Sequence, residues 1–363
     1  MRKSLITLAV LAAASGAASA QSNVTIFGIV DVSVTHGTGS LASKTQLASG
    51  ELSGSRLGFR GTEDLGGGLK ANFWLEMGMN PANGSGVTTT TNNQASGLVG
   101  GGALTFNRIS FVSLSGNWGE LRMGRDYTPT FNSHVYYDPA ALSGVMTSQT
   151  AIGSLTIFAP NAPGVALAGA RASNSVSYFS PNMSGFNAQV MYAMGNNPSN
   201  VPTPDDGKYT GARLQYAAGP LDLSVAAARM KLAAVGDVRE TVIAGTYDFN
   251  PLKVWGIYLR DTSGTSINVK AEMLGVTYPV GVTLLKATFS RSSATSVTGA
   301  PAGTTNKFAL GAVYNLSKRT SIYLSGATVR NKDGASAMPF FGVAVNGPNG
   351  TSRAFDLGVR HIF

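Results

Sequence analysis

Arginines and lysines are the residues of this chain whose types and spacing could do chemistry. In SRLGFRGT (55–62), Arg56 and Arg60 fall on one side of an extended chain, and Leu57 and Phe59 fall on the other. Such strict alternation means that one face meets something apolar while the other meets water. Guanidinium groups that line a water-filled space can attract anions.

The same phase places further charged residues on the polar face. LKANFWLEM (69–77) directs Lys70 and Glu76 away from its apolar side, and Arg108 stands opposite the apolar Ile109. These arginines either form a positive eyelet that attracts anions or each pair with a carboxylate of the same space. The alternation leaves both alternatives open.

Arg122 and Arg125 conflict with this simple alternation, because both cannot face the same side of one regular strand. We expect a β-bulge or a strand end to resolve the conflict. Arg122 is the lumen candidate of the two, and Arg125 is expected to matter less.

Other kinds of site find little support. The chain has no cysteine and three scattered histidines, which argues against a zinc site and against a Ser-His-Asp set. We therefore expect no enzyme activity, no metal and no cofactor. The basic residues stand singly among alternating segments, without a Lys/Arg run or a binding motif, so nucleic-acid binding is not expected either.

Composition narrows the fold class. Only 12% of the 363 residues are charged, against about 25% in typical globular domains. After the N-terminus no stretch of about 18 apolar residues appears, which excludes a transmembrane helix in the body of the chain. A Gly/Ser/Thr-rich soluble β protein and a membrane β-barrel both fit these numbers.

The N-terminus predicts export. MRKSLITLAVLAAASGAASA has two basic residues, a short apolar run and an A-x-A site before Ala20, as in a signal peptide for the Sec route. Residues 1–20 are then removed, Gln21 begins the mature chain, and residues 21–363 form one barrel domain. Without Arg2 and Lys3, 25 basic and 18 acidic residues remain, a net charge of +7.

Alternating segments separated by turn residues recur from end to end, which favours a transmembrane antiparallel β-barrel of about 16 strands, an all-β fold. The predicted strands are 23–35, 51–62, 69–79, 105–115, 119–126, 172–180, 186–195, 208–218, 221–231, 238–248, 252–262, 267–278, 282–291, 306–315, 320–331 and 351–363. The terminal DLGVRHIF alternates up to Phe363, and we expect this last strand to pair with the first. A barrel of this size leaves an aqueous lumen.

Short and long connections alternate along the chain, as tight periplasmic turns and long external loops do in outer-membrane barrels. The longest connection, 127–171, is too apolar for a disordered segment. We expect it to fold into the lumen as the third loop and to narrow the pore.

Four segments resemble the general porins of betaproteobacteria, which are Gram-negative trimeric outer-membrane porins. They are ASGELSGSRLGFRGTEDLGGGLKANFWLE (48–76), NRISFVSLSGNWGELRMGRDYTP (107–129), NSVSYFSPNMSGF (174–186) and the terminal DLGVRHIF. The resemblance implies a homotrimer of passive diffusion pores in the outer membrane, in contact with lipid and lipopolysaccharide. It also implies that Phe363 acts as the signal read by the barrel assembly machinery.

The resemblance further implies a pore constriction in which arginines face acidic groups. By motif, the arginines are Arg56, Arg108 and Arg171, and the acidic candidates are Glu76, Asp126 and Asp138. Arg60, Lys70 and Arg122 are additional basic candidates of the lumen.

The function predicted from these observations is a general porin for small hydrophilic solutes and ions, with an anion preference set by the lumen arginines. The alternative is an outer-membrane adhesin whose long loops bind partners. An adhesin needs no wide lumen, so the inward arginines and the long third loop favour the pore.

Overall fold

The computed structural model describes residues 23–363 except 88, 92, 95–97, 100–103, 149–168, 234–235, 266 and 341–344. The predicted signal peptide, with its cleavage between Ala20 and Gln21, lies outside the described residues. Within them the chain is almost entirely β-structure, and no helix is long and apolar enough to cross a membrane.

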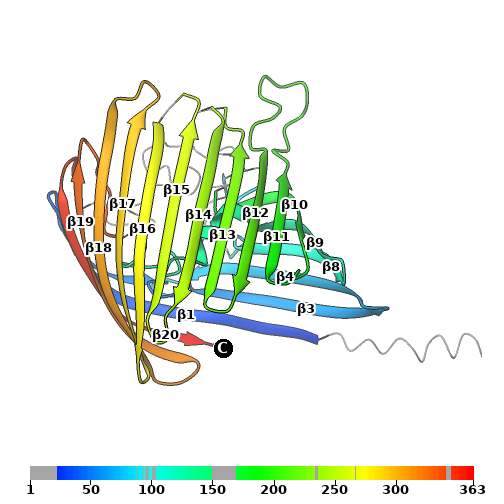
Figure 1. Cartoon of the computed structure of the whole chain (residues 1–363), viewed down its shortest axis with the longest axis horizontal. Helices are drawn as coiled ribbons and strands as arrows, with labels where there is room; N and C mark the ends of the chain where they lie inside the picture. Colours follow the sequence, from blue (N-terminus) through cyan, green and yellow to red (C-terminus); the bar gives the residue numbers. More distant parts are fainter. Residues whose placement is uncertain are drawn as a thin grey trace, which may run out of the picture.

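Sixteen antiparallel strands form one closed ring (Figure 1). They are β1 (Asn23–Thr38), β3 (Arg56–Gly66), β4 (Leu69–Asn80), β8 (Ile109–Gly116), β9 (Gly119–Tyr127), β10 (Arg171–Phe179), β11 (Phe186–Ala193), β12 (Tyr209–Ala218), β13 (Leu221–Met230), β14 (Val238–Asp248), β15 (Lys253–Ser263), β16 (Ile267–Val280), β17 (Thr283–Ser296), β18 (Pro301–Asn315), β19 (Thr320–Lys332) and β20 (Thr351–Ile362). The predicted transmembrane barrel is thus confirmed.

Shorter elements lie in the connections. They are β2 (Ser43–Ser49), β5 (Ser85–Gly86), β6 (Thr89–Thr90), β7 (Leu98–Val99) and the helix α2 (Pro129–Val135). None of them was predicted, because segments this short show no clear hydrophobic periodicity. β2 folds back on the loop end of β1, with Val34 opposite Leu47.

Several predicted boundaries were wrong. The segment predicted as strand from 51 begins to pair only at Arg56, because the backbone N–H groups of Leu52 and Ser53 donate to Asp31 Oδ2 at 2.9 and 2.6 Å instead. The strand predicted from 105 begins at Ile109. Conversely, much of the predicted loop 292–304 belongs to β17 and β18, whose Ser/Thr-rich ends pair without an apolar face.

The alternation of apolar and polar residues sorts side chains between the outside and the inside of the ring. On β20, Phe355, Leu357 and Val359 are 48–53% exposed, whereas Asp356 between them is fully buried. Similar exposed apolar side chains occur around the ring, for example Ile243 and Leu274. This pattern fits an outer surface in contact with lipid and a polar interior.

The ring is closed by pairing β1 with β20, from Ile29 opposite Ile362 to Thr38 opposite Arg353. Gly28 and Phe363 exchange both backbone hydrogen bonds, at 3.0 and 3.1 Å. Figure 1 shows the C-terminus beside β1 accordingly. The expectation that the last strand pairs with the first is confirmed.

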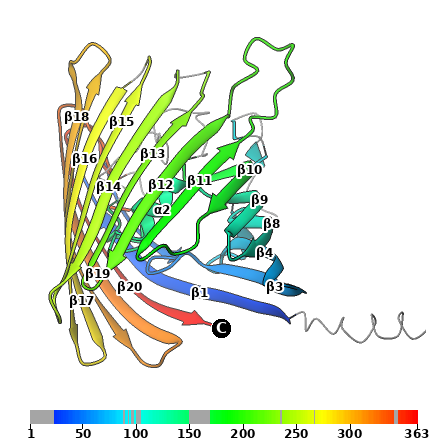
Figure 2. The same ribbon diagram turned by 45° about the vertical axis from the view of Figure 1, so that its right-hand side comes forward.

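Short turns join the strands at one end of the ring, and the longest connections lie at the other (Figure 1). The longest connection joins β9 to β10 and contains α2, which packs against β11, β12, β13 and β14. Figure 2 shows α2 behind β12, on the inner side of the strands.

The seam between β1 and β20 generates a first prediction. A Cβ atom on Gly28 would overlap the ring of Phe363, whereas a Cβ on Gly256 of β15 would meet no atom within 4 Å. We expect Gly28→Val to lower the free energy of unfolding by about 1–3 kcal/mol through overpacking. Heat-modifiable mobility on SDS gels and thermal unfolding measure the effect.

The matched control is Gly256→Val, which adds the same side chain to the ring without a clash. Equal stability of the two variants would show that the seam between β1 and β20 is no more sensitive to an added side chain than the rest of the ring.

Candidate functional site

Two of the predicted arginines meet a single carboxylate on the inner wall. Arg56 begins β3, Arg108 immediately precedes β8, and Glu76 lies between them on β4. Arg108 Nε forms an ion pair with Glu76, and Arg56 Nη1 lies 3.4 Å from the same Oε1 atom. Glu76 is only 2% exposed, so the shared carboxylate is almost fully enclosed.

Arg171 joins this pair through Tyr127, the last residue of β9. Arg108 Nη2 and Arg171 Nη2 both donate to the Tyr127 hydroxyl, at 2.8 and 3.0 Å. The Arg171 guanidinium also lies 4.5 Å from the centre of the Tyr127 ring, within the range of a cation–π contact. Tyr127 stacks in turn on Phe131 of α2, with ring centres 5.1 Å apart.

We call Arg56, Arg108, Arg171, Glu76 and Tyr127 the arginine cluster. It holds three guanidinium groups and one carboxylate, which leaves a formal charge of +2. The structure thus brings together four of the residues predicted for the constriction. Tyr127 was missed, and only its place at the junction of a strand and the long connection could have drawn attention to it.

The cluster borders open space. A cavity of about 690 Å³ is lined by Arg56, Arg108, Arg171 and Tyr127, together with residues 53–55 and 141–144. Its lining therefore combines the inner wall with the long connection between β9 and β10.

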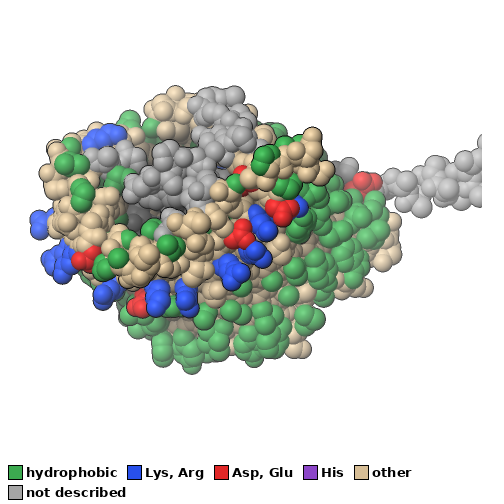
Figure 3. All heavy atoms as spheres, turned by 90° about the horizontal axis from the view of Figure 1, so that it is seen from above, with side chains coloured by type: hydrophobic (Ala, Val, Ile, Leu, Met, Phe, Trp, Pro, Cys, Tyr) green, Lys and Arg blue, Asp and Glu red, His purple; other side chains and the backbone are tan. Residues whose placement is uncertain are grey.

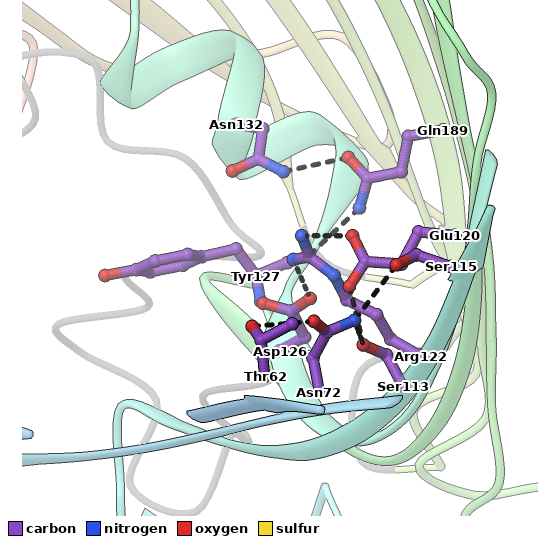
Figure 4. A network of polar contacts seen from close by, with 10 residues as sticks. All are labelled: Thr62, Asn72, Ser113, Ser115, Glu120, Arg122, Asp126, Tyr127, Asn132 and Gln189. Atoms are coloured by element: carbon purple, nitrogen blue, oxygen red, sulfur yellow. Dashed lines mark hydrogen bonds and ion pairs between the residues drawn. The ribbon is translucent and has the colours of Figure 1, made fainter. Parts of the chain in front are cut away.

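Asp126 lies elsewhere, in a polar network that Figure 4 shows from close by. Asp126 Oδ2 accepts from Arg122 Nη1 at 2.9 Å, and Arg122 Nη2 donates to Glu120 at 2.9 Å. Asp126 Oδ1 accepts from the Tyr127 backbone N–H at 2.7 Å. Asp126 and Glu120 together outweigh the charge of Arg122, and Asp126 and Arg122 hold the end of β9 that carries Tyr127.

The network continues to the helix. Gln189 Nε2 donates to the Tyr127 carbonyl at 3.2 Å and accepts from Asn132 Nδ2 at 2.8 Å through its Oε1 (Figure 4). Thr128 caps α2 by accepting from the Phe131 N–H at 3.3 Å. The contacts of Asp126, which precedes Tyr127, and of Thr128, which follows it, therefore hold the Tyr127 backbone in place.

Asp138 also stays apart from the arginine cluster. Its carboxylate accepts from the N–H groups of Ala140 and Ser148 at 2.6 and 3.0 Å, and from the Ser148 hydroxyl. It organises its own segment and does not oppose the arginines across the lumen.

The two remaining basic candidates lie outside the cluster as well. The Arg60 guanidinium lies over the rings of Phe27 and Trp74, 5.2 and 5.3 Å from the ring centres. Lys70 is exposed beside the short turn that joins β3 to β4.

The strand that carries Arg122 and Arg125 has an irregular backbone between the two residues, as their odd spacing requires. Gly124 between them has φ +140°, and the register of β9 with β10 shifts between Ala172 and Ser175. Arg125 donates to the Asn107 carbonyl at 2.6 Å. An irregularity is therefore present at this point of the ladder, with its extra residue on β10.

The described part of the long connection, 128–148, contacts inward-facing residues of several strands. Ser133 and Ser224 hydroxyls are 2.8 Å apart, and Lys286 Nζ donates to the Pro139 carbonyl at 2.8 Å. On the opposite side, the Val145 N–H donates to Asp356 at 3.3 Å. Residues 149–168 of this connection lie outside the described residues.

Glu51 adds a buried acidic group where residues 50–55 meet this connection. Its backbone is so close to Gly144 that a Cβ on that glycine would overlap it, and its Oε2 atom is buried without a hydrogen-bond partner among the described residues. Burial first, and then the nearby Asp356 and Asp31, raise the pKa of Glu51 from 4.5 to about 8. Among the described residues no three His, Asp or Glu side chains are placed to hold a metal ion.

Comparison with known proteins gives one consistent result. Residues 7–334 match the family model described as Gram-negative porin. Over the full length of both chains, the sequence is 39% identical to outer membrane porin protein 32 of Delftia acidovorans. The fold is similar to the anion-selective porin from Comamonas acidovorans, with 33% identity, a TM-score of 0.80, and coverage of 94% of this chain and 100% of that one.

A more distant structure shares the fold alone. The trimer form of OmpT from Vibrio cholerae is 14% identical with a TM-score of 0.63, and the match covers 94% of this chain and 99% of that one.

The shared phenol of the arginine cluster generates a second prediction. Tyr127→Phe keeps the ring contacts with Phe131 and Arg171 but removes the oxygen to which two guanidinium groups donate. We expect a loss of about 1–3 kcal/mol in the free energy of unfolding, because buried donors lose their partner. Thermal unfolding measures it, with Tyr258→Phe on the exposed outer face as the control. Equal effects in both variants would contradict a tethering role of Tyr127.

Glu51 generates a third prediction. Because the folded protein keeps the Glu51 proton up to about pH 8 and the unfolded chain releases it near 4.5, folding stability falls as the pH rises between these values. Glu51→Gln imitates the protonated form, so its advantage in melting temperature over the wild type should grow from pH 4 to pH 9. Glu63→Gln, which alters an exposed carboxylate, is the control. Parallel curves for wild type and Glu51→Gln would contradict the assignment.

Proposed function

The chain belongs to the Gram-negative porin family and forms a pore in the outer membrane, and we propose that its arginine cluster makes this pore prefer anions. Proteins of this family are channels and not enzymes. The proposal is therefore passive diffusion of small hydrophilic solutes and ions, with charge selection at the inner wall.

The excess of two positive charges in the arginine cluster is the observation that carries the proposal. Glu76 and Tyr127 hold the guanidinium groups at the cavity but cannot neutralise them. The walls of the pore have a low dielectric constant, which concentrates the field of these charges in the water between them. An anion that passes is attracted, whereas a cation is repelled.

The fixed position of the arginines supports selection without strong binding. Each guanidinium is already oriented by protein contacts, so the field is preorganised and no side chain must rearrange when an ion passes. The similarity to a porin described as anion-selective supports the same conclusion.

We further propose that the connection between β9 and β10 limits the size of solutes. Its described part, 128–148, packs against inward-facing side chains on both sides of the ring and lines the cavity together with the arginine cluster. Solutes would pass between this segment and Arg56, Arg108 and Arg171.

Assembly and targeting complete the proposal. The outer-membrane location implies export, for which residues 1–20 supply the signal. Phe363 is proposed as the residue read by the barrel assembly machinery, since it ends the seam strand. A homotrimer is proposed from the family relationship, and lipid and lipopolysaccharide are the proposed surroundings of the outer face.

The fourth prediction tests charge selection. In planar bilayers under a low-salt KCl gradient, the reversal potential of the wild type should have the sign of anion preference. Arg56→Gln/Arg108→Gln should move it toward cations, because the formal charge of the arginine cluster falls from +2 to zero. Glu76→Gln should move it further toward anions. The preference should fall at 1 M salt, where the Debye length is about 3 Å instead of about 10 Å at 0.1 M.

The control is Arg319→Gln, which removes a charge at the exposed turn between β18 and β19. Equal permeability of potassium and chloride at low salt would contradict anion preference. An unchanged reversal potential in the arginine variant, with normal conductance, would show that other residues of the pore select the ions.

A further inference from the structure

Three aromatic rings lie on the inner face of the barrel, beside the arginine cluster and toward the short turns. Trp74 is two residues from Glu76 on β4, and Phe111 of β8 is directly opposite Trp74. Phe27 of β1 is directly opposite Gly58 of β3, which is itself opposite Glu76. Because directly opposite residues point to the same side of a sheet, all three rings share the inward face of Glu76.

This inner position is unusual for aromatic side chains. The interior of an outer-membrane barrel is polar, and aromatic residues are expected on the outer surface near the membrane interfaces. Figure 3 shows hydrophobic side chains spread over the outer wall below the rim, where contact with lipid explains them. Contact with lipid cannot explain rings on the inner wall.

Arg60 of β3 lies over two of these rings. Its guanidinium carbon is 5.2 Å from the centre of the Phe27 ring and 5.3 Å from the centre of the Trp74 ring. The two rings meet edge to face, with their centres 5.2 Å apart. We call Arg60, Phe27 and Trp74 the Arg60 site.

The backbone holds the Arg60 site in place. A Cβ atom on Gly58 would overlap the Phe27 ring, so this ring lies flat against the strand where a side chain is missing. Arg60 and Trp74 are directly opposite each other on β3 and β4. The rings and the guanidinium are therefore arranged before any solute arrives.

The charge of Arg60 is available to a solute. Arg60 is exposed, and among the described residues no carboxylate lies within ion-pair distance of it. Arg122 makes a similar ring contact, 4.6 Å from the centre of Phe111, but it is paired with both Glu120 and Asp126. The Arg60 site thus combines aromatic faces with an uncompensated cation.

The Arg60 site follows the arginine cluster along the pore. Arg56 and Arg60 share one face of β3 and are separated by about 13 Å, at about 3.3 Å per residue. The short turn between β3 and β4 lies beyond Arg60. An anion that leaves the arginine cluster toward the short turns therefore meets Arg60 next on this wall.

We propose that the Arg60 site binds aromatic carboxylates in transit, so that the pore favours them over aliphatic acids of the same charge and size. The inference rests on the proposed anion preference and adds a class of solute to it. The carboxylate accepts charge-assisted hydrogen bonds from the guanidinium. The ring of the solute then packs against Trp74 or Phe27.

Two features select this class of solute. An inorganic anion uses the charge of Arg60 but not the rings, and a neutral aromatic molecule uses the rings but leaves the charge without a partner. The exposure of Arg60 keeps the interaction weak, because water screens it. Weak binding suits a pore, since a solute must leave the site as readily as it enters.

The experiment uses the full folded protein in planar bilayers, with benzoate and cyclohexanecarboxylate as probes. These two anions have the same charge and similar size, but only benzoate is aromatic. Each is titrated against the chloride current to find the concentration that gives half of the maximal block. The variants are Trp74→Leu, Trp74→Tyr and Arg60→Gln. The control is Lys70→Gln, which removes an exposed charge from the same face of β4 near the short turn.

We expect benzoate to block the wild type at a concentration about 3- to 10-fold lower than cyclohexanecarboxylate, as one added aromatic contact provides. Trp74→Leu should abolish this difference, and Trp74→Tyr should keep most of it. Arg60→Gln should weaken the block by both acids, and Lys70→Gln should have a smaller effect.

Equal half-blocking concentrations of the two acids in the wild type would overturn the proposal, as would a benzoate preference that survives Trp74→Leu. Equal effects of Lys70→Gln and Arg60→Gln would also overturn it, because Arg60 would then act only as one charge among others. Heat-modifiable mobility on SDS gels checks the folding of each variant, and Phe27→Leu replaces Trp74→Leu if that variant does not fold.

The reversal potential in KCl is recorded on the same preparations and separates this proposal from the proposed function. Absence of anion preference in the wild type would contradict the proposed function. Anion preference together with an equal block by the two acids would contradict the Arg60 site alone.

Discussion

A backbone N–H or C=O group that meets hydrocarbon without a partner costs several kcal/mol, and only a closed ring of strands leaves none of them at an open edge. Pairing of β1 with β20 closes the ring in this protein. Alternation follows from closure, because every strand then has one face toward lipid and one toward the interior. The lumen also follows, since a ring of this many strands is too wide for side chains to fill.

A wide polar interior creates a second problem, which is how charged side chains keep fixed positions beside water. The arginine cluster solves it by sharing partners. Glu76 serves two guanidinium groups, and the Tyr127 hydroxyl serves two, with Arg108 common to both. Shared partners hold three like charges close together while leaving most of their field uncompensated, which individual ion pairs would not do. The contrast with Arg122 is instructive, since Glu120 and Asp126 together outweigh its charge.

The strands could be predicted from the sequence because alternation is local, and it also placed Arg56, Arg108 and Glu76 on one face. The roles of Asp126 and Asp138 could not be predicted in this way. Each carboxylate binds backbone N–H groups close to it in the chain, and that local use keeps it apart from the arginine cluster. A rule that assigns every acid of the long connection to the constriction ignores this competition.

Residues 50–55 and Tyr127 show a different limit. The first segment leaves the ladder because Asp31 accepts its N–H groups, and Tyr127 matters because arginines from two other parts of the chain reach it. Both depend on contacts between neighbouring strands that are far apart in the sequence, and these contacts exist only in the folded sheet. Periodicity carries no information about them.

Net charge is a poor guide to ion selection in such a protein. The mature chain has an excess of seven basic residues if residues 1–20 are removed. Seven basic residues of the strands face away from the lumen, namely Arg229, Arg239, Arg260, Lys270, Arg291, Arg330 and Arg353. A low-dielectric wall and the lipid separate these charges from the pore, so they act on the surroundings of the barrel. A shift of one residue in the register of a strand would exchange the two sets. Selection by the pore therefore depends on the phase of each arginine along its strand and not on the total charge.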